Sequence, residues 1–275
     1  MTAQKIAALV FFCFFFYTHV FAEPFLKVEP SAPALGVGGA FTAMVDEATA
    51  SYWNPARLAL LRREWSSAAG FQLGSGGGSD GLLYASGAYR FRNLGFGAWW
   101  VHHSLSDVME DRGILGGAVS LTTGLLQVGG GMKWMSQSTE SFSASGLGID
   151  LSAMADFLDM ISVGLMMQDV VQTKLKVGEK IQTLINPTYR ISGSFRLGSF
   201  TFSTEAVLHE EDLQSLRYGI EVRLASIVAF RVGKNNDLWS WGVGVGVLEQ
   251  FRFDVANRQD PDNGDVWIIS GHVAF

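Results

Sequence analysis

Residues 188–197 read TYRISGSFRL, and residues 199–208 read SFTFSTEAVL. In both stretches large apolar residues alternate with polar or small ones, so that Tyr189, Ile191 and Phe195 share one face of the first stretch. An α-helix would scatter such residues around its axis, whereas the period of two in a strand places each set on one surface. The two stretches therefore predict neighbouring β-strands.

The same alternation extends over most of the chain. It is clear in SLRYGIEVRL at 215–224 and in LWSWGVGVGVL at 238–248, where tryptophan and valine alternate with serine and glycine. Extended outward, it predicts about fourteen strands. They lie near residues 64–73, 82–90, 94–103, 113–121, 125–135, 145–155, 159–168, 187–197, 199–208, 213–224, 226–232, 238–248, 250–256 and 266–275.

The connections between these strands fall into two classes. Those after even-numbered strands are tight, as at 91–93 and 122–124, whereas those after odd-numbered strands are longer and polar. The longer ones are 74–81, 104–112, 169–186, 233–237 and 257–265. An outer-membrane barrel with both termini in the periplasm shows this asymmetry. The predicted fold is therefore an all-β, transmembrane antiparallel β-barrel.

The composition agrees with a membrane protein. Hydrophobic residues make up 48% of the 275 residues and charged residues 17%, against about 25% charged residues in average soluble domains. This excludes a disordered chain, and the net charge of −6 argues against a nucleic-acid partner. Cys13 is the one cysteine, which excludes a disulfide scaffold. Beyond the N-terminus, the apolar runs 33–45 and 238–248 are too short to span a membrane as helices.

The N-terminus reads as an export signal. Lys5 precedes an apolar run over 6–16, and Ala22 supplies the small residue expected before a cleavage site. An uncleaved membrane anchor is the alternative. The predicted organisation is a signal peptide at 1–22, a plug segment at 23–62 and the barrel at 63–275.

The C-terminus ends in an aromatic residue. In WIISGHVAF at 267–275, Trp267, Ile269, Val273 and Phe275 fall on one face, which we expect to meet lipid. A final strand ending in an aromatic residue resembles the signal recognised by the bacterial barrel-assembly machinery. Trp267 and Phe275 are therefore the predicted assembly signal, with that machinery and outer-membrane lipid as partners.

The segment before the barrel is rich in small residues. A barrel of fourteen strands encloses a lumen that its wall side chains cannot fill, and glycines allow a backbone to lie against the inner wall. Asn54 and Pro55 can form a turn before the first strand. A short periplasmic helix outside the barrel is the alternative. The candidate plug and ligand residues are Gly36, Gly38, Gly39, Asp46, Asn54, Pro55 and Arg57.

Strand parity directs a set of charged residues into the lumen. Buried charges must pair or stay hydrated, so these residues form either an ion-pair network that holds the plug or a wet selectivity surface for a polar or amphipathic solute. Their mixed signs argue against a strongly ion-selective pore. They are Asp150, Arg190, Arg196, Glu205, Arg217, Glu221, Arg223, Arg231, Arg252 and Asp254.

No pattern in the chain favours catalysis, a metal or a cofactor. Neighbouring side chains of a strand point to opposite faces, so His102 and His103 cannot easily share a metal. The stretch 242–246, GVGVG, lies within a strand and lacks the following helix of a phosphate-binding loop. We predict that the protein is not an enzyme. The tryptophans suit interfacial belts, and they include Trp65, Trp99, Trp100, Trp239, Trp241 and Trp267.

Residues 39–59 carry a more specific pattern, GAF-x-A-x-x-D-x-A-x-A-x-x-x-NPA-x-LA. It resembles the N-terminal signature of the PorV/PorQ family, relatives of the FadL-type outer-membrane transporters. The resemblance implies a fourteen-stranded outer-membrane barrel. Arg57 departs from the glycine that usually follows NPA in the family, and the chain is shorter than typical members, which leaves open whether a family-type ligand cavity is present.

The resemblance implies two functions. The first is passage of small hydrophobic compounds, with the plug as a gate hinged at Asn54 and Pro55. The second is a PorV-like barrel that binds a secretion-system protein through the loop 169–186, with Lys174, Lys176 and Lys180. A purely structural barrel is a third possibility.

Overall fold

The computed structural model describes most of the chain. It covers residues 29–74, 81–105, 110–139, 143–171, 173–177, 180–209, 212–225, 227–261 and 264–275. The predicted signal peptide at 1–22 and residues 23–28 of the predicted plug segment lie outside the described residues.

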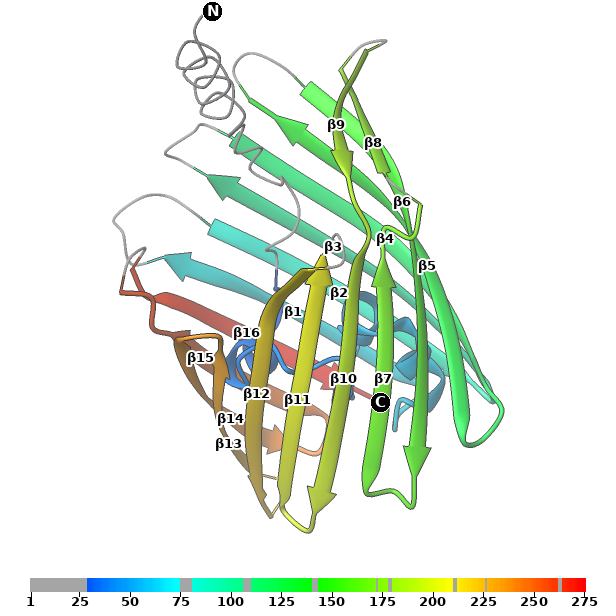
Figure 1. Ribbon diagram of the computed structural model, residues 1–275. Helices are drawn as coiled ribbons and strands as arrows, with labels where there is room; N and C mark the ends of the chain where they lie inside the picture. Colours follow the sequence, from blue (N-terminus) through cyan, green and yellow to red (C-terminus); the bar gives the residue numbers. More distant parts are fainter. Residues whose placement is uncertain are drawn as a thin grey trace, which may run out of the picture.

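Fourteen antiparallel strands close into a barrel (Figure 1). The strands follow one another around the wall in chain order, and β1 pairs with β16 over Ser66↔Ala274 to Gly74↔Val266. The strands are β1 (Trp65–Gly74), β2 (Gly81–Phe91), β3 (Leu94–Leu105), β4 (Glu110–Thr122), β5 (Leu126–Ser138), β6 (Ser143–Phe157), β7 (Ile161–Gln168), β10 (Thr188–Leu197), β11 (Phe200–His209), β12 (Asp212–Leu224), β13 (Val228–Asn235), β14 (Leu238–Leu248), β15 (Phe251–Arg258) and β16 (Val266–Ala274). The predicted closed barrel is confirmed.

Three connections differ from the prediction. The loop expected at 104–112 is shorter, because His103 pairs with Arg112 and Leu105 with Glu110. The loop expected at 169–186 contains a hairpin of β8 (Thr173–Val177) and β9 (Lys180–Ile185), which projects beyond the barrel wall (Figure 1). The long loop expected at 233–237 is wrong, because Gly233 pairs with Ser240 and Asn235 with Leu238. Only residues 236–237 are left to turn the chain. The polar residues of the stretch 233–237 therefore belong to the end of β13 and to this turn.

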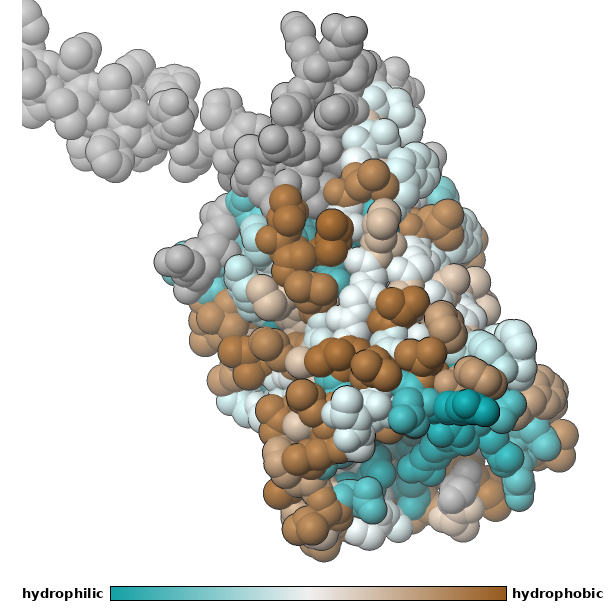
Figure 2. Space-filling model, turned by 90° about the vertical axis from the view of Figure 1, so that its right-hand side faces the viewer, coloured by the Kyte–Doolittle hydropathy of each residue, from teal (hydrophilic) through white to brown (hydrophobic). Residues whose placement is uncertain are grey.

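The outer surface of the barrel is apolar. In β2 the burial alternates residue by residue, as the period of two requires. Figure 2 shows the resulting hydrophobic surface. Large apolar side chains that point outward include Phe71, Leu83, Trp100, Leu115, Leu147, Ile191, Phe202, Ile220 and Trp241. Such a surface suits the acyl chains of a bilayer.

The described part of the chain contains no helix that is both long enough and apolar enough to cross a membrane.

Residues 29–62, called the plug below, lie inside the barrel (Figure 1). The plug contains the short helix α2 (Ala32–Gly36), the single turn α3 (Ala50–Trp53) and the 3-10 helix η1 (Pro55–Leu60). Almost every plug residue is buried. Pro55 begins η1, in the first turn, where its missing N–H is not needed for a hydrogen bond within the helix.

Candidate functional site: the plug and the lumen wall

The plug backbone lies directly on the backbone of β13. Gly38 has φ +66°, and a Cβ added there would stand 2.5 Å from the backbone nitrogen of Lys234. On the other side of the contact, a Cβ on Gly233 of the wall would clash with the backbone of Val37. Only glycine accommodates both the left-handed conformation and this approach. The predicted glycine contact of the plug is therefore made through main chains.

The two neighbouring predicted glycines touch arginines of the wall. A Cβ on Gly36 would lie 3.2 Å from Cβ of Arg231, and one on Gly39 would lie 2.7 Å from Nη1 of Arg217. The carbonyl of Gly39 accepts a hydrogen bond from Nη1 of Arg217 at 3.3 Å.

Asp46 and Glu47 of the plug bind two arginines near the end of the barrel that carries the short turns. Nη1 of Arg223 donates to Asp46 at 3.0 Å, and Arg252 donates to Glu47. Glu47 also accepts hydrogen bonds from the hydroxyls of Ser31 (3.0 Å) and Thr49 (2.9 Å). These bonds use the acceptor capacity of a carboxylate that is almost fully buried.

The two arginines are themselves joined by further charges of the wall. Glu221 accepts from Arg223 at 2.6 Å and from Arg231 at 2.7 Å, and Asp254 accepts from Arg231 at 2.7 Å and from Arg252 at 2.8 Å. The result is an uninterrupted series of ion pairs that leaves the plug and returns to it. This ionic chain consists of Asp46, Arg223, Glu221, Arg231, Asp254, Arg252 and Glu47.

A second charged cluster holds the start of the plug. Glu29 accepts from Nη1 of Arg217 at 2.6 Å. Glu205, which has no exposed surface, accepts from the backbone N–H of Thr42 at 3.0 Å and lies 3.6 Å from Arg217. The guanidinium of Arg190 lies 3.7 Å from Glu205.

Two carboxylates of the plug, Asp46 and Glu29, are ionised in this setting. Burial raises the pKa of Asp46, but the guanidinium groups of Arg223 and Arg252 outweigh burial and hold that pKa well below its usual range. Burial also raises the pKa of Glu29, and Arg217, Arg258 and Arg190 together lower it below the ordinary value. Both carboxylates therefore stay charged at neutral pH.

The NPAR stretch fixes the end of the plug to β6. Nδ2 of Asn54 donates to the carbonyl of Thr42 at 3.0 Å, and the N–H of Ala56 donates to the hydroxyl of Ser152 at 2.8 Å. Arg57 donates to the carbonyl of Val45 at 3.1 Å and pairs with Asp156 at 2.6 Å. A glycine in place of Arg57 would lack this ion pair between plug and wall.

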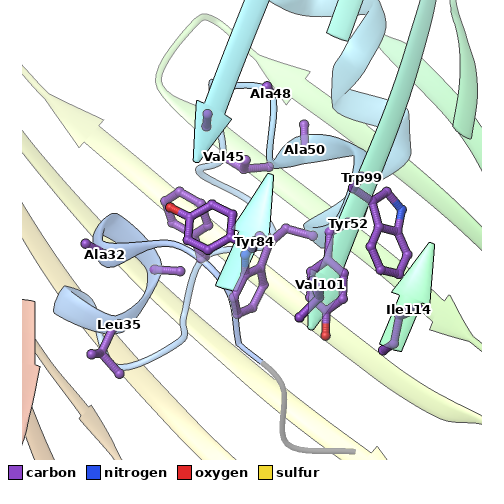
Figure 3. Packing of buried hydrophobic residues seen from close by; sticks show 14 of the residues in the cluster. Ala32, Leu35, Val45, Ala48, Ala50, Tyr52, Tyr84, Trp99, Val101 and Ile114 are labelled. Carbon is purple, nitrogen blue, oxygen red and sulfur yellow. The ribbon is translucent and has the colours of Figure 1, made fainter. Parts of the chain in front are cut away.

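The opposite side of the plug packs on apolar side chains of β2–β4 (Figure 3). Tyr52 meets Trp99 edge to face at a centroid distance of 4.9 Å, and Phe41 meets Trp53 in the same way at 5.7 Å. The guanidinium of Arg190, from the charged side, lies 4.9 Å from the ring of Trp53. The large wall side chains that β2–β4 contribute to this cluster are Leu82, Tyr84, Trp99, Val101 and Ile114.

The prediction that Trp99 belongs to an interfacial belt is wrong. Trp99 is 5% exposed and faces the plug, whereas its neighbour Trp100 is 42% exposed and faces outward. Adjacent residues of one strand cannot share a face. The parity rule could have assigned Trp99 to the lumen.

Lys133 is a lumen charge that the sequence analysis missed. Its ammonium lies 2.9 Å from both Asp150 and Asp169, and the N–H of Asp169 donates to Asp150 at 2.9 Å. All three are buried where the chain leaves β7 toward the β8–β9 hairpin. Lys133 lies an even number of residues from the buried Gln127 and Met135 of β5, and this spacing predicts that its side chain points into the lumen.

The remaining predicted residues have clear places. All the charges predicted from parity face the interior, and Arg196 lines a cavity at the turn end. Trp267 packs edge to face on Trp241 at 5.3 Å. The backbone of Phe275 exchanges hydrogen bonds with Trp65 at 2.9 and 3.1 Å, and its ring is exposed. Recognition by the barrel-assembly machinery stays a prediction.

Free space beside the aromatic cluster is small. A cavity of about 20 Å³ lies among Tyr52, Trp99, Ile114, Lys133 and other side chains. This is about the space of one water molecule. A solute as large as benzene, which needs a cavity of about 150 Å³, does not fit in this cavity.

The barrel matches solved outer-membrane channels. A FadL homologue from Pseudomonas aeruginosa aligns with a TM-score of 0.66 at 10% identity, over 90% of this chain and 99% of that chain. The toluene transporter TbuX from Ralstonia pickettii gives 0.67 at 13% identity, over 90% and 98%. The monoaromatic hydrocarbon channel CymD gives 0.68 at 11% identity, over 89% and 97%. The chain therefore has the fold of the FadL-type barrels.

No protein-family model matches the sequence, and no curated protein matches it. The closed barrel and its apolar outer surface define an outer-membrane β-barrel protein. The resemblance of residues 39–59 to the PorV/PorQ signature stays a prediction.

Proposed function

We propose that this protein passes small hydrophobic compounds across the outer membrane, and that the plug gates the passage. The observation that carries the proposal is the apolar wall of the lumen, formed by Leu82, Tyr84, Trp99, Val101 and Ile114. The interior of a water-filled porin is polar, whereas this wall is apolar. An apolar solute that binds to it removes apolar surface from water, which is favourable.

The similar structures support the same solute class. TbuX is a toluene transporter and CymD a monoaromatic hydrocarbon channel. An apolar cavity of about 150 Å³ can hold benzene, far more than the 20 Å³ beside Tyr52. Passage therefore requires the plug to move away from β2–β4.

A reversible disulfide between plug and wall tests this requirement. Ser51 of α3 and Gly97 of β3 face each other on the apolar side of the plug, since a Cβ on Gly97 would lie 2.7 Å from the Cβ of Ser51. A disulfide joins Cβ atoms about 3.5–4.5 Å apart, so a small shift of the plug accommodates the bridge. In liposomes that contain the double variant Ser51→Cys/Gly97→Cys, we expect toluene flux to fall severalfold on oxidation and to recover on reduction.

The single variants Ser51→Cys and Gly97→Cys are the matched controls. They introduce the same side chains but cannot form the bridge, so oxidation should leave their flux unchanged. Equal flux of the oxidised and reduced double variant, with the bridge verified by mass spectrometry, would contradict gating by the plug. Flux equal to that of protein-free liposomes in the wild type would contradict transport itself.

The β8–β9 hairpin favours a second candidate, a docking barrel for a secretion-system protein. It projects beyond the wall (Figure 1), and its pairing with β6 is limited to Ser145↔Lys176. Affinity capture from membranes separates the two functions. A stoichiometric secretion protein lost on Lys174→Glu/Lys176→Glu would support docking, and a barrel recovered alone would disfavour it.

A further inference from the structure

A large cavity opens at the end of the barrel that carries the short turns. Its volume is about 980 Å³, and it lies between the end of the plug at 61–63 and the turns near residues 198–199, 225–227 and 249–250. Figure 2 shows a hollow lined with hydrophilic residues at the lower end of the molecule. Small-molecule sites have volumes of roughly 300–1,000 Å³, so the cavity is large enough for a solute.

Arginines dominate the charge of this cavity, called the vestibule below. The acidic residues among its described lining are Asp46 and Glu249. Glu249 pairs with Arg63 and Asp46 with Arg223. The arginines of the lining are Arg62, Arg63, Arg196, Arg223 and Arg252.

Two of these arginines form no ion pair within the described part of the chain. The side chains of Arg62 and Arg196 take part in no ion pair or hydrogen bond there, although both line the vestibule. Arg223 is partly accessible, with 34% of its side chain exposed. A concave wall with an excess of one sign focuses its field and concentrates ions of the opposite charge.

We propose that the vestibule binds a phosphate-type oxyanion between Arg62, Arg196 and Arg223, in competition with Asp46 of the plug. A guanidinium group offers paired N–H donors whose spacing matches two oxygens of a phosphate or a carboxylate. Three such groups around one cavity can neutralise a doubly charged anion. The same chemistry is carried by free phosphate and by a phosphate monoester on a larger solute.

The competition follows from the position of Arg223. This arginine joins Asp46 to the ionic chain through its Nη1 at 3.0 Å and holds Glu221 through its Nε at 2.6 Å. An anion that takes Nη1 displaces Asp46 and leaves the bond to Glu221 in place. Anion binding and the hold on the plug are then linked, and the linkage acts equally in both directions.

Calorimetric titration of the full barrel in detergent micelles tests the site. Inorganic phosphate and phenyl phosphate are the probes, and the variant Arg62→Gln/Arg196→Gln should bind both at least tenfold more weakly. Arg90→Gln/Arg92→Gln is the matched control, because it removes the same charge from β2 and its turn outside the vestibule. Its affinity should equal that of the wild type.

The probes also distinguish the source of the anion. Tighter binding of phenyl phosphate indicates a phosphate on a larger solute, and equal binding indicates the free anion. Unchanged affinity in Arg62→Gln/Arg196→Gln, or an equal loss in the control variant, would overturn the proposal.

A variant that is expected to bind phosphate more tightly tests the competition. Asp46→Asn removes the competing carboxylate, so phosphate should bind severalfold more tightly than to the wild type. Unchanged affinity would show that Asp46 does not compete. These titrations measure no flux, so their failure would leave the proposed transport of hydrophobic compounds untouched.

Discussion

The two sides of the lumen hold the same plug by different chemistry. On β2–β4 the contacts are apolar and aromatic, such as Tyr52 on Trp99. On β10–β15 they are directional ion pairs, such as Asp46 with Arg223. Apolar contacts are non-directional and scale with the area removed from water, whereas a charge-assisted hydrogen bond fixes both distance and angle.

The charged and the apolar contacts therefore have different roles in holding the plug. The charged side sets the position of the plug, because each carboxylate has one place where its donors converge. The apolar side can separate from the plug without leaving an unpaired charge. A solute of low polarity is therefore expected to move the plug first along β2–β4.

The largest effect is expected from breaking the ionic chain at its centre. Arg231 is almost fully buried and bridges Glu221 and Asp254 at 2.7 Å each. Arg231→Met leaves two buried carboxylates without this partner, and removal of one member of a buried pair costs about 3–5 kcal/mol. Urea unfolding of the refolded barrel in detergent measures the loss of stability.

Arg92→Met is the control for this prediction, because Arg92 lies in the β2–β3 turn outside the lumen. Its stability should stay within about 0.5 kcal/mol of the wild type. Equal stability of the Arg231 variant would mean that the ionic chain does not position the plug.

A somewhat smaller effect is expected on the apolar side. Trp99→Ala removes a buried indole that packs on Tyr52, and such truncations cost about 3–5 kcal/mol when the cavity cannot collapse. We expect about 3 kcal/mol, because the plug side chains can shift toward the space. Trp100→Ala, on the outward face of the same strand, is the matched control for urea unfolding and should lose less. A reversed order would contradict the assignment of the two faces.

The barrel was predictable because its signal is local. The alternation in 188–197 or 215–224 reports which face meets lipid, and no other part of the chain is needed to see it. The same parity placed Glu221, Arg231 and Arg252 in the lumen.

The pairing of these charges was not predictable. Which carboxylate meets which arginine depends on the stagger between strands and on the path of the plug, and neither is written in any single segment. Lys133 has the inward parity, but the glycines around it weaken the alternation of its strand. The lysines of the β8–β9 hairpin give residues 173–185 the polarity of a loop, and that polarity hides the two strands.

A moderate effect with a defined pH dependence is expected at Asp46. The contact with Arg223 lowers the pKa of Asp46 in the folded state, so its stabilisation is fully present above the unfolded pKa of about 4 and is lost as the pH falls toward the folded value. Asp46→Asn should therefore be less stable than the wild type by about 1–2 kcal/mol at neutral pH.

Urea unfolding between pH 3 and pH 8 measures this difference. It should stay constant from pH 8 to about pH 5 and shrink below about pH 4. A difference that shrinks on the alkaline side would contradict the sign of the pKa shift.

The smallest effect is expected at the rim, where charges pair in the open. Arg63 and Glu249 lie 3.2 Å apart, but their side chains are 48% and 84% exposed. Exposed pairs contribute about 0–1 kcal/mol because water screens them and both side chains lose freedom. Arg63→Met should therefore cost under about 0.5 kcal/mol in urea unfolding, and added salt should remove even that. A loss as large as that of Arg231→Met would mean that charge alone, irrespective of burial, holds the plug, and the contrast between the two sides of the lumen would no longer explain its position.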